Sequence, residues 1–276
     1  MTAESDPHPR GREKEDPIWG NRPGRTVEPG VDPFAELETA VFKRPVLSLY
    51  LPLPRGRPNW RALVDHVLEA EFENPPQELV EELQEVVAEL GRRHFECPAL
   101  AVFSSRLLGI FRLWRLPDPV LPRLAWAGWF DLEPIRAQLE RRPPALVVVA
   151  DKEGARVFSA VLDQIEELLD LEGVEVSRHR QGGWSAADFQ RHEDEQARAN
   201  LKNTARAVGR FLERGFYRRL ILVGPPEAQA ELERLLSPRA RAMVTLRGRL
   251  GRRAEGVDLH RSLRQLLASI AEGRSR

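Results

Sequence analysis

The sequence has little of several residue types on which common sites depend. One of its 276 residues is cysteine, so an internal disulfide and a cysteine-based zinc site are excluded. The six histidines lack the spacing of metal ligands, and we expect neither a metal nor another cofactor. No apolar run reaches the roughly 18 residues that cross a membrane, and the polar N-terminus is unlike a signal peptide. These absences predict a cytoplasmic protein with no membrane partner.

Net charge is also missing, because Lys+Arg and Asp+Glu both number 42. The balance conceals an asymmetry between the two halves of the chain. From residue 143 onward there are 23 basic and 19 acidic side chains, and the remainder has 19 against 23. A hydrophobic content of 42% supports packed cores, and the length suits one large or two small domains. The second half is therefore the better place to look for a nucleic-acid contact.

The first 33 residues are rich in proline, glycine and charge. Ile18 and Trp19 are the only large apolar residues before Val27. Such a segment buries too little apolar surface to offset the entropy lost on ordering. We predict a disordered tail over residues 1–33, either inert or docking on RNA or protein through Trp19.

Residues 34–142 have the pattern of an α+β domain. An apolar run at 46–51 is typical of a buried strand, and Asn59 is placed to cap a helix over 60–72. A second amphipathic helix is expected over 77–93, and the runs 99–103 and 107–116 indicate a hairpin. Three tryptophans of this region are interpreted as packing residues rather than base-stacking platforms; they are Trp114, Trp126 and Trp129.

Residues 143–276 alternate strands and helices, which predicts an α/β sandwich. The β-branched run 145–150 is typical of a central strand, and Asp151 begins a turn toward a paired strand at 155–161. Beyond these lie a long helix and then a strand, a helix, a strand and a closing helix, expected at 220–224, 227–236, 242–246 and 258–270.

The most distinctive stretch is residues 178–214. Gly182 and Gly183 follow the basic residues Arg178, His179 and Arg180, and glycine pairs let a backbone approach a partner closely. The helical run behind them has apolar residues at three- and four-residue spacing, which marks one buried face. Basic residues follow one another at intervals of four; they are Arg198, Lys202, Arg206, Arg210 and Arg214. A glycine tip on a basic helix is suited to reaching into RNA.

These residues resemble the central domain of the archaeal and eukaryotic class-1 peptide-chain release factors. In that family a basic stretch leads to Gly-Gly-Gln-Ser and an Arg- and Phe-containing helix, and the glutamine helps place water on the peptidyl-tRNA ester. Gly182, Gly183 and Ser185 match the motif, and Phe189 and Arg191 fall near the start of the helix. The resemblance implies an N-terminal α+β domain followed by a ribonuclease-H-like α/β middle domain of release-factor type.

The chain departs from the motif at the reacting position. Trp184 stands where the glutamine is expected, and an indole N–H is a donor only. The superfamily also includes Pelota and Balon. A bacterial branch of it commonly reads Gly-Trp-Ser-Gln followed by Phe-Gln-Arg-His. The second string is present at 189–192, but Ala186 replaces the glutamine. The loop residues therefore receive no catalytic assignment.

The resemblance implies a ribosome-associated factor that contacts rRNA and tRNA for rescue or hibernation, with a translational GTPase as a candidate partner. An active peptidyl-tRNA ester hydrolase using the displaced Gln181 or Gln190 is the alternative, and a general RNA-binding module is another. Predicted RNA-contacting residues are Arg178, His179, Arg180, Trp184, Gln190, Arg191, Arg198, Lys202 and Arg206.

Two further features leave alternatives open. Asp151 after a strand could be the first carboxylate of a two-metal nuclease, although a turn former is the simpler interpretation. A group of arginines without intervening acids could bind phosphate or merely aid solubility; its members are Arg239, Arg241, Arg247, Arg249, Arg252 and Arg253.

Overall fold

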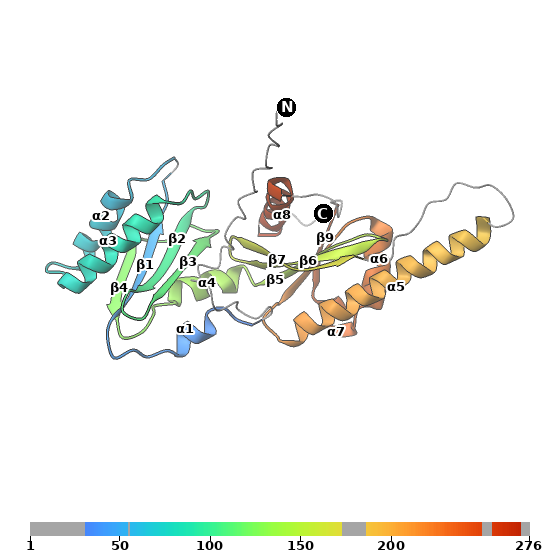
Figure 1. Ribbon diagram of the computed structural model, residues 1–276, viewed down its shortest axis with the longest axis horizontal. Coiled ribbons are helices and arrows are strands. Elements are labelled where there is room, and N and C mark those ends of the chain that lie inside the picture. Colours follow the sequence, from blue (N-terminus) through green and yellow to red (C-terminus); the bar gives the residue numbers. More distant parts are fainter. Residues whose placement is uncertain (1–30, 55, 173–185, 250–255, 272–276) are drawn as a thin grey trace, which may run out of the picture.

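The strands gather into two sheets that follow one another along the longest axis of the molecule (Figure 1). The computed structural model describes residues 31–54, 56–172, 186–249 and 256–271. We call β1–β4 with α1–α4 the first unit, and β5–β9 with α5–α8 the second unit. Residues 1–30 of the predicted tail lie outside the described residues, and the predicted domain boundaries stay predictions.

The first sheet is antiparallel, with the order β3-β2-β1-β4. Its strands are β1 (Val46–Pro52), β2 (Ala99–Ser105), β3 (Ile110–Leu116) and β4 (Arg123–Ala127). The predicted strand and hairpin are confirmed, whereas β4 was not predicted because it follows a run of prolines at 117, 119 and 122.

Strand β1 is apolar apart from Ser48, because both faces of its sheet are covered. Alternate residues such as Leu47 and Leu49 pack toward α2 (Trp60–Glu71) and α3 (Gln77–Gly91). The others, such as Tyr50, share a core with residues of α4 (Glu133–Arg141) and with Phe34, the N-cap of α1 (Ala35–Thr39). Asn59 caps α2 as predicted, since its side chain accepts a hydrogen bond from the Ala62 amide.

The second sheet has the order β7-β6-β5-β8-β9, and within it β6 runs against the other strands. This is the ribonuclease-H-like arrangement, so the predicted fold class is confirmed. The strands are β5 (Ala145–Ala150), β6 (Gly154–Val161), β7 (Gln164–Glu172), β8 (Arg219–Val223) and β9 (Val244–Gly248). Strand β7 was not predicted, because its acidic sequence has no apolar alternation.

Helices cover both faces of this sheet. Residues of α5 (Ala186–Glu213), α6 (Pro226–Leu235) and α7 (Pro238–Ala242) join one core with Leu146 and Val148. Leu259 and Leu263 of α8 (Gly256–Ala271) join the opposite core with Val147. No helix in the described ranges is long and apolar enough to cross a membrane. The short helices α1 and α7 were not predicted, whereas α2, α3, α6 and α8 agree with their predictions within a few residues.

The two units share buried contacts at a seam. Phe216, after α5, packs against a core of each unit, and Val161 at the end of β6 belongs to the core of the first unit. The Asp163 amide donates to the Arg115 carbonyl at 3.4 Å, which joins the β6–β7 turn to β3. Burial raises the pKa of the Asp163 carboxyl, while Arg264 and other nearby arginines oppose the shift. The seam is therefore held by apolar packing and by polar contacts.

Gly224 occupies the tightest backbone contact at the carboxyl end of the second sheet. Its φ is +140°, and an added Cβ would lie 2.0 Å from the Ala150 carbonyl oxygen. The buried Gln229 side chain donates to the carbonyls of Gly224 and Gly248, at 2.6 and 2.7 Å. A glycine is required here because both the conformation and the space exclude a side chain.

We expect Gly224→Ala to lower the free energy of unfolding by at least about 2 kcal/mol, from overpacking and backbone strain together. Gly209→Ala is the matched control, because a Cβ at this position of α5 meets nothing within 4 Å. That change should stabilise the protein by about 0.5–1 kcal/mol. Chemical denaturation measures both, and equal effects would contradict the described packing.

Cys97 is the lone thiol, and it is half-buried rather than reactive. Its Sγ–H donates to the Ala99 carbonyl at 3.3 Å. Burial, helped by the negative charge of Asp163, raises the pKa of the Cys97 thiol to about 12. The thiolate is the nucleophile in alkylation, so a raised pKa suppresses the reaction.

Iodoacetamide at pH 8 should therefore alkylate the folded protein on the order of a hundredfold more slowly than the protein unfolded in urea. The rate for the folded protein should keep rising with pH beyond about pH 9, where an ordinary thiol is already largely ionised. Mass spectrometry of quenched samples measures both rates, and a fast reaction in the folded state would contradict a structural thiol.

Candidate nucleic-acid interface

Helix α5 is a rod fixed along one side to the second sheet. Its 28 residues correspond to about 42 Å, and its amino-terminal turns extend past the edge of the sheet (Figure 1). Ala197, Leu201, Val208 and Leu212 are buried, as the apolar spacing predicted. Asn200 donates from its side chain to the Lys152 carbonyl at 3.0 Å, which ties the helix to the β5–β6 turn. Among the side chains of α5 whose burial is described, Ala197 is the first buried one.

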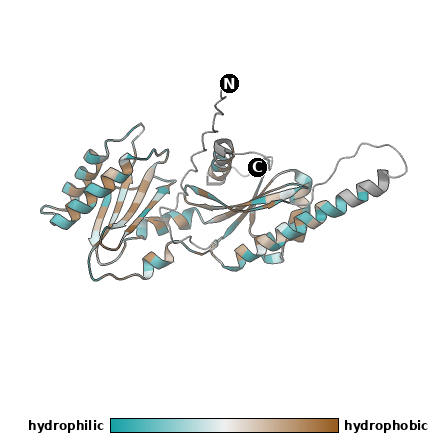
Figure 2. Ribbon diagram, in the orientation of Figure 1, coloured by the Kyte–Doolittle hydropathy of each residue, from teal (hydrophilic) through white to brown (hydrophobic). Residues whose placement is uncertain are grey.

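The predicted basic residues lie on the exposed side of this rod. Arg198, Lys202, Arg206 and Arg210 are all exposed, and Figure 2 shows α5 mainly in the colour of hydrophilic residues. A four-residue step advances by about 40° around a helix, so the row winds gradually. Arg198 consequently lies 3.3 Å from Glu231 of α6. We call these four residues the α5 basic row.

Three residues of the α5 basic row, Lys202, Arg206 and Arg210, have no ion-pair partner among the described residues. Among the described residues, the Arg206 side chain makes only a long hydrogen bond with the Asn203 side chain, at 3.4 Å. In the same part of the chain, the side chains of Lys202 and Arg210 make no hydrogen bond or ion pair. Unpaired cations on a rigid support are suited to binding phosphate, since no existing pair has to be broken.

The predicted loop itself lies outside the described residues. This holds for Arg178, His179, Arg180, Gly182, Gly183, Trp184 and Ser185. Ala186 is the first residue of α5, and Gln190 and Arg191 follow within its first two turns. Arg191 is exposed. The assignment of these residues to RNA contact remains a prediction.

Asp151 is a turn former, in agreement with the simpler of the two interpretations. Its carboxylate accepts from the backbone amides of Glu153 and Gly154, at 2.8 and 3.0 Å. In the described ranges no group of three or more His, Cys, Asp and Glu residues could hold a metal ion. The nuclease alternative therefore has no support at the described end of β5.

The second arginine group is only partly available for phosphate. Arg247 forms a bidentate pair with Glu233, and Arg241 donates to the Glu233 and Arg234 carbonyls at the end of α6. No acid lies among these arginines in the sequence, but the fold brings Glu233 of α6 within ion-pair distance of Arg247. Arg239 and Arg249 are exposed, whereas Arg252 and Arg253 lie outside the described residues.

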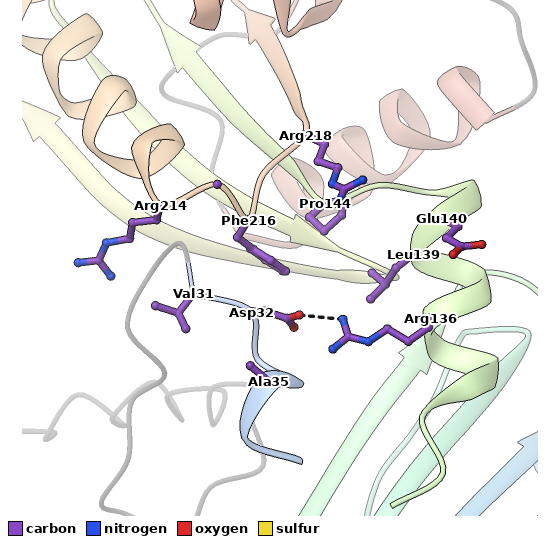
Figure 3. Close-up of a pocket in the computed structure, with 11 residues that line it drawn as sticks. Val31, Asp32, Ala35, Arg136, Leu139, Glu140, Pro144, Arg214, Phe216 and Arg218 are labelled. Atoms are coloured by element: carbon purple, nitrogen blue, oxygen red, sulfur yellow. Dashed lines mark hydrogen bonds and ion pairs between the residues drawn. The ribbon is translucent and has the colours of Figure 1, made fainter. Parts of the chain in front are cut away.

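A cleft of about 520 Å³ lies between the segment that follows α5 and the first unit (Figure 3). Phe216 and Leu139 point toward one another across it, and Arg218 lies on its rim. Arg136 donates to Asp32 at 2.7 Å and also pairs with Glu38, so this arginine is already occupied. Sequence patterns contain no sign of the cleft, because its walls come from separate segments of the chain.

One tryptophan assignment needs correction. Trp114 is 3% exposed and Trp126 packs partly against a core, as predicted for packing residues. Trp129 is 61% exposed, so its assignment to packing was wrong. The chain turns inward at the next residue, Phe130, and leaves the indole at the surface.

Comparison with known proteins places these features in a family context. The sequence profile of the bacterial archaeo-eukaryotic release factor family 10 matches residues 131–271, just over half of the chain. No curated protein sequence matches the chain.

Several solved structures resemble parts of the chain. An archaeal translation termination factor, aRF1, is 16% identical over 87% of this chain and 75% of its own, with a TM-score of 0.32. Pelota of Archaeoglobus fulgidus is 16% identical over 63% and 49%, with a TM-score of 0.30. Dom34 of S. cerevisiae, a translation termination-like factor in RNA quality control that interacts with Hbs1, is 14% identical over 63% and 52%, with a TM-score of 0.32.

Proposed function

Because the chain belongs to the bacterial archaeo-eukaryotic release factor family 10, we propose that it is a ribosome-associated translation factor. In this proposal the Gly182-Gly183-Trp184 loop is presented toward the peptidyl-transferase centre or the tRNA acceptor end. The partners are rRNA and tRNA, and a translational GTPase is a further proposed partner that the family resemblance implies.

The observation that carries the proposal is the α5 basic row. Two of its residues, Lys202 and Arg210, have exposed side chains without partners among the described residues, on a helix fixed to the sheet by a buried face. A rigid helix that carries cations can bind a phosphate backbone without the entropy cost of ordering a flexible segment. The loop precedes the end of the rod that extends past the sheet, so any contact along the rod brings the loop toward RNA.

The loop sequence favours occupying the ribosome over cutting peptidyl-tRNA. Ester hydrolysis needs a positioned water and stabilisation of the developing oxyanion. Loop glycines could retain the backbone donor, but neither Trp184 nor Ala186 supplies an amide to hold water. We propose a role in rescue or hibernation, with an active hydrolase using Gln181 or Gln190 as the alternative.

The first test removes charge from the rod. In Lys202→Ala/Arg206→Ala/Arg210→Ala, we expect weaker co-sedimentation with purified ribosomes. The slope of log affinity against log salt should fall by about 0.7–0.9 for each phosphate that the variant no longer neutralises. The matched control is Arg61→Ala/Arg92→Ala/Arg234→Ala, which removes three exposed arginines that are paired with carboxylates elsewhere. Absence of co-sedimentation of the unaltered protein even at low salt would defeat the proposal.

The second test separates occupancy from hydrolysis. Ribosome complexes carrying labelled peptidyl-tRNA are mixed with the protein, and released peptide is measured over time. We expect release no faster than in buffer, since losing one preorganised catalytic group costs on the order of 10²–10³ in rate. Ala186→Gln restores an amide at the position used by the bacterial branch, and a gain of release by this variant would show that the scaffold still fits the site. Release by the unaltered protein would instead support the hydrolase alternative.

A further inference from the structure

A second surface with the character of a nucleic-acid contact lies on the first unit, around Trp129. The Phe42 amide donates to the Gly128 carbonyl at 2.7 Å, and Val46 pairs with Ala127 in the sheet. These two contacts hold residues 42–46 alongside the end of β4. The segment that carries Lys43 and Arg44 therefore lies alongside the segment that carries Trp129, although a long stretch of sequence separates the two.

The exposed groups of this surface are an aromatic ring, a small apolar residue and two cations. Trp129 is 61% exposed and Val41 is 84% exposed, while Lys43 and Arg44 are also exposed. The neighbouring Phe42 and Phe130 turn inward and pack edge to face, with ring centroids 5.5 Å apart. The support beneath the indole is therefore fixed. We call Val41, Lys43, Arg44 and Trp129 the Trp129 patch.

Charge pairing sets these two cations apart from most of the first unit. Arg61, Arg92, Arg93, Arg106, Arg123 and Arg136 each lie within ion-pair distance of a carboxylate. Lys43 and Arg44 have no hydrogen-bond or ion-pair partner in the part of the chain that the structure describes. Two unpaired positive charges beside an exposed indole are complementary to a phosphate backbone carrying an unstacked base.

We infer that the Trp129 patch binds single-stranded RNA, with the indole stacking on one base and Lys43 and Arg44 neutralising the adjacent phosphates. A protein partner fits less well, because the core of a protein interface needs a wider apolar area than Trp129 and Val41 provide. The choice of RNA as the biological ligand rests on the proposed function. The end of β4 belongs to the first unit and α5 runs along the second sheet (Figure 1), so the patch and the α5 basic row lie on different units.

The test measures binding of a fluorescent single-stranded oligouridine by anisotropy at low salt. It uses the full chain with Lys202, Arg206 and Arg210 changed to alanine, so that the α5 basic row adds little binding. Trp129→Ala should weaken binding about 5- to 150-fold, since a base–aromatic stack is worth about 1–3 kcal/mol. Trp129→Phe should restore most of it because a ring is retained. Lys43→Ala/Arg44→Ala should lower the salt slope by about 1.4.

Two controls make the result specific. Leu121→Ala removes another exposed apolar side chain, one that is 85% exposed, and should leave binding unchanged. Arg61→Ala/Arg92→Ala removes the same charge from the same unit at paired positions and should change the slope far less. Equal affinity of Trp129→Ala and Leu121→Ala would overturn the inference.

The outcome is also distinguishable from failure of the proposed function. The oligonucleotide assay contains no ribosomes. RNA binding by the Trp129 patch can therefore be absent while the protein still co-sediments with ribosomes, and it can be present while co-sedimentation is absent. If Trp129→Ala keeps full affinity for RNA but loses co-sedimentation, the patch is a protein-docking site and the inference is wrong.

Discussion

The packing of α5 across the second sheet is the interaction on which the remaining features depend. Burial of Leu201, Val208 and Leu212 contributes roughly 5–9 kcal/mol. Repulsion between like charges four residues apart costs only about 0.2–0.5 kcal/mol per pair. The apolar face therefore outweighs the basic row by a wide margin. A helix fixed in this way holds unpaired cations in the open with little loss of stability, and its amino-terminal end extends beyond the sheet.

The carboxyl-terminal end of α5 lies at the seam between the two units. Gly215, with a φ of +78°, reverses the chain after α5, and Phe216 then packs against a core of each unit. The β6–β7 turn makes a second connection through Asp163 and Gln164, whose side chain donates to the Leu113 carbonyl. The two units are therefore joined at two places, and one of them directly follows the carboxyl-terminal end of α5.

The sequence predicted the parts of the fold that local patterns determine. Strands β1 and β5 are apolar because they are buried on both faces, and α2 begins at a visible cap, Asn59. Strand β7 was not predicted because it is an acidic edge strand with an irregular register opposite β6. Contacts between side chains were not predicted for a different reason. The pairing of Glu233 with Arg247, and the exposure of Trp129, are set by segments that meet only in the folded chain.

Because the chain has no net charge, its attraction for RNA depends on where the charged residues lie on the surface. Screening limits attraction between exposed charges to about 8–10 Å at physiological salt, so a neutral chain exerts little pull on RNA from a distance. Attraction to RNA therefore has to come from groups of basic residues that have no acidic residues beside them. Asp170 and Glu172 lie on the edge strand β7, while Lys202 and Arg210 lie on the outer side of α5. The fold thus separates charges that the composition balances, and cationic surfaces arise from packing rather than from an excess of arginine.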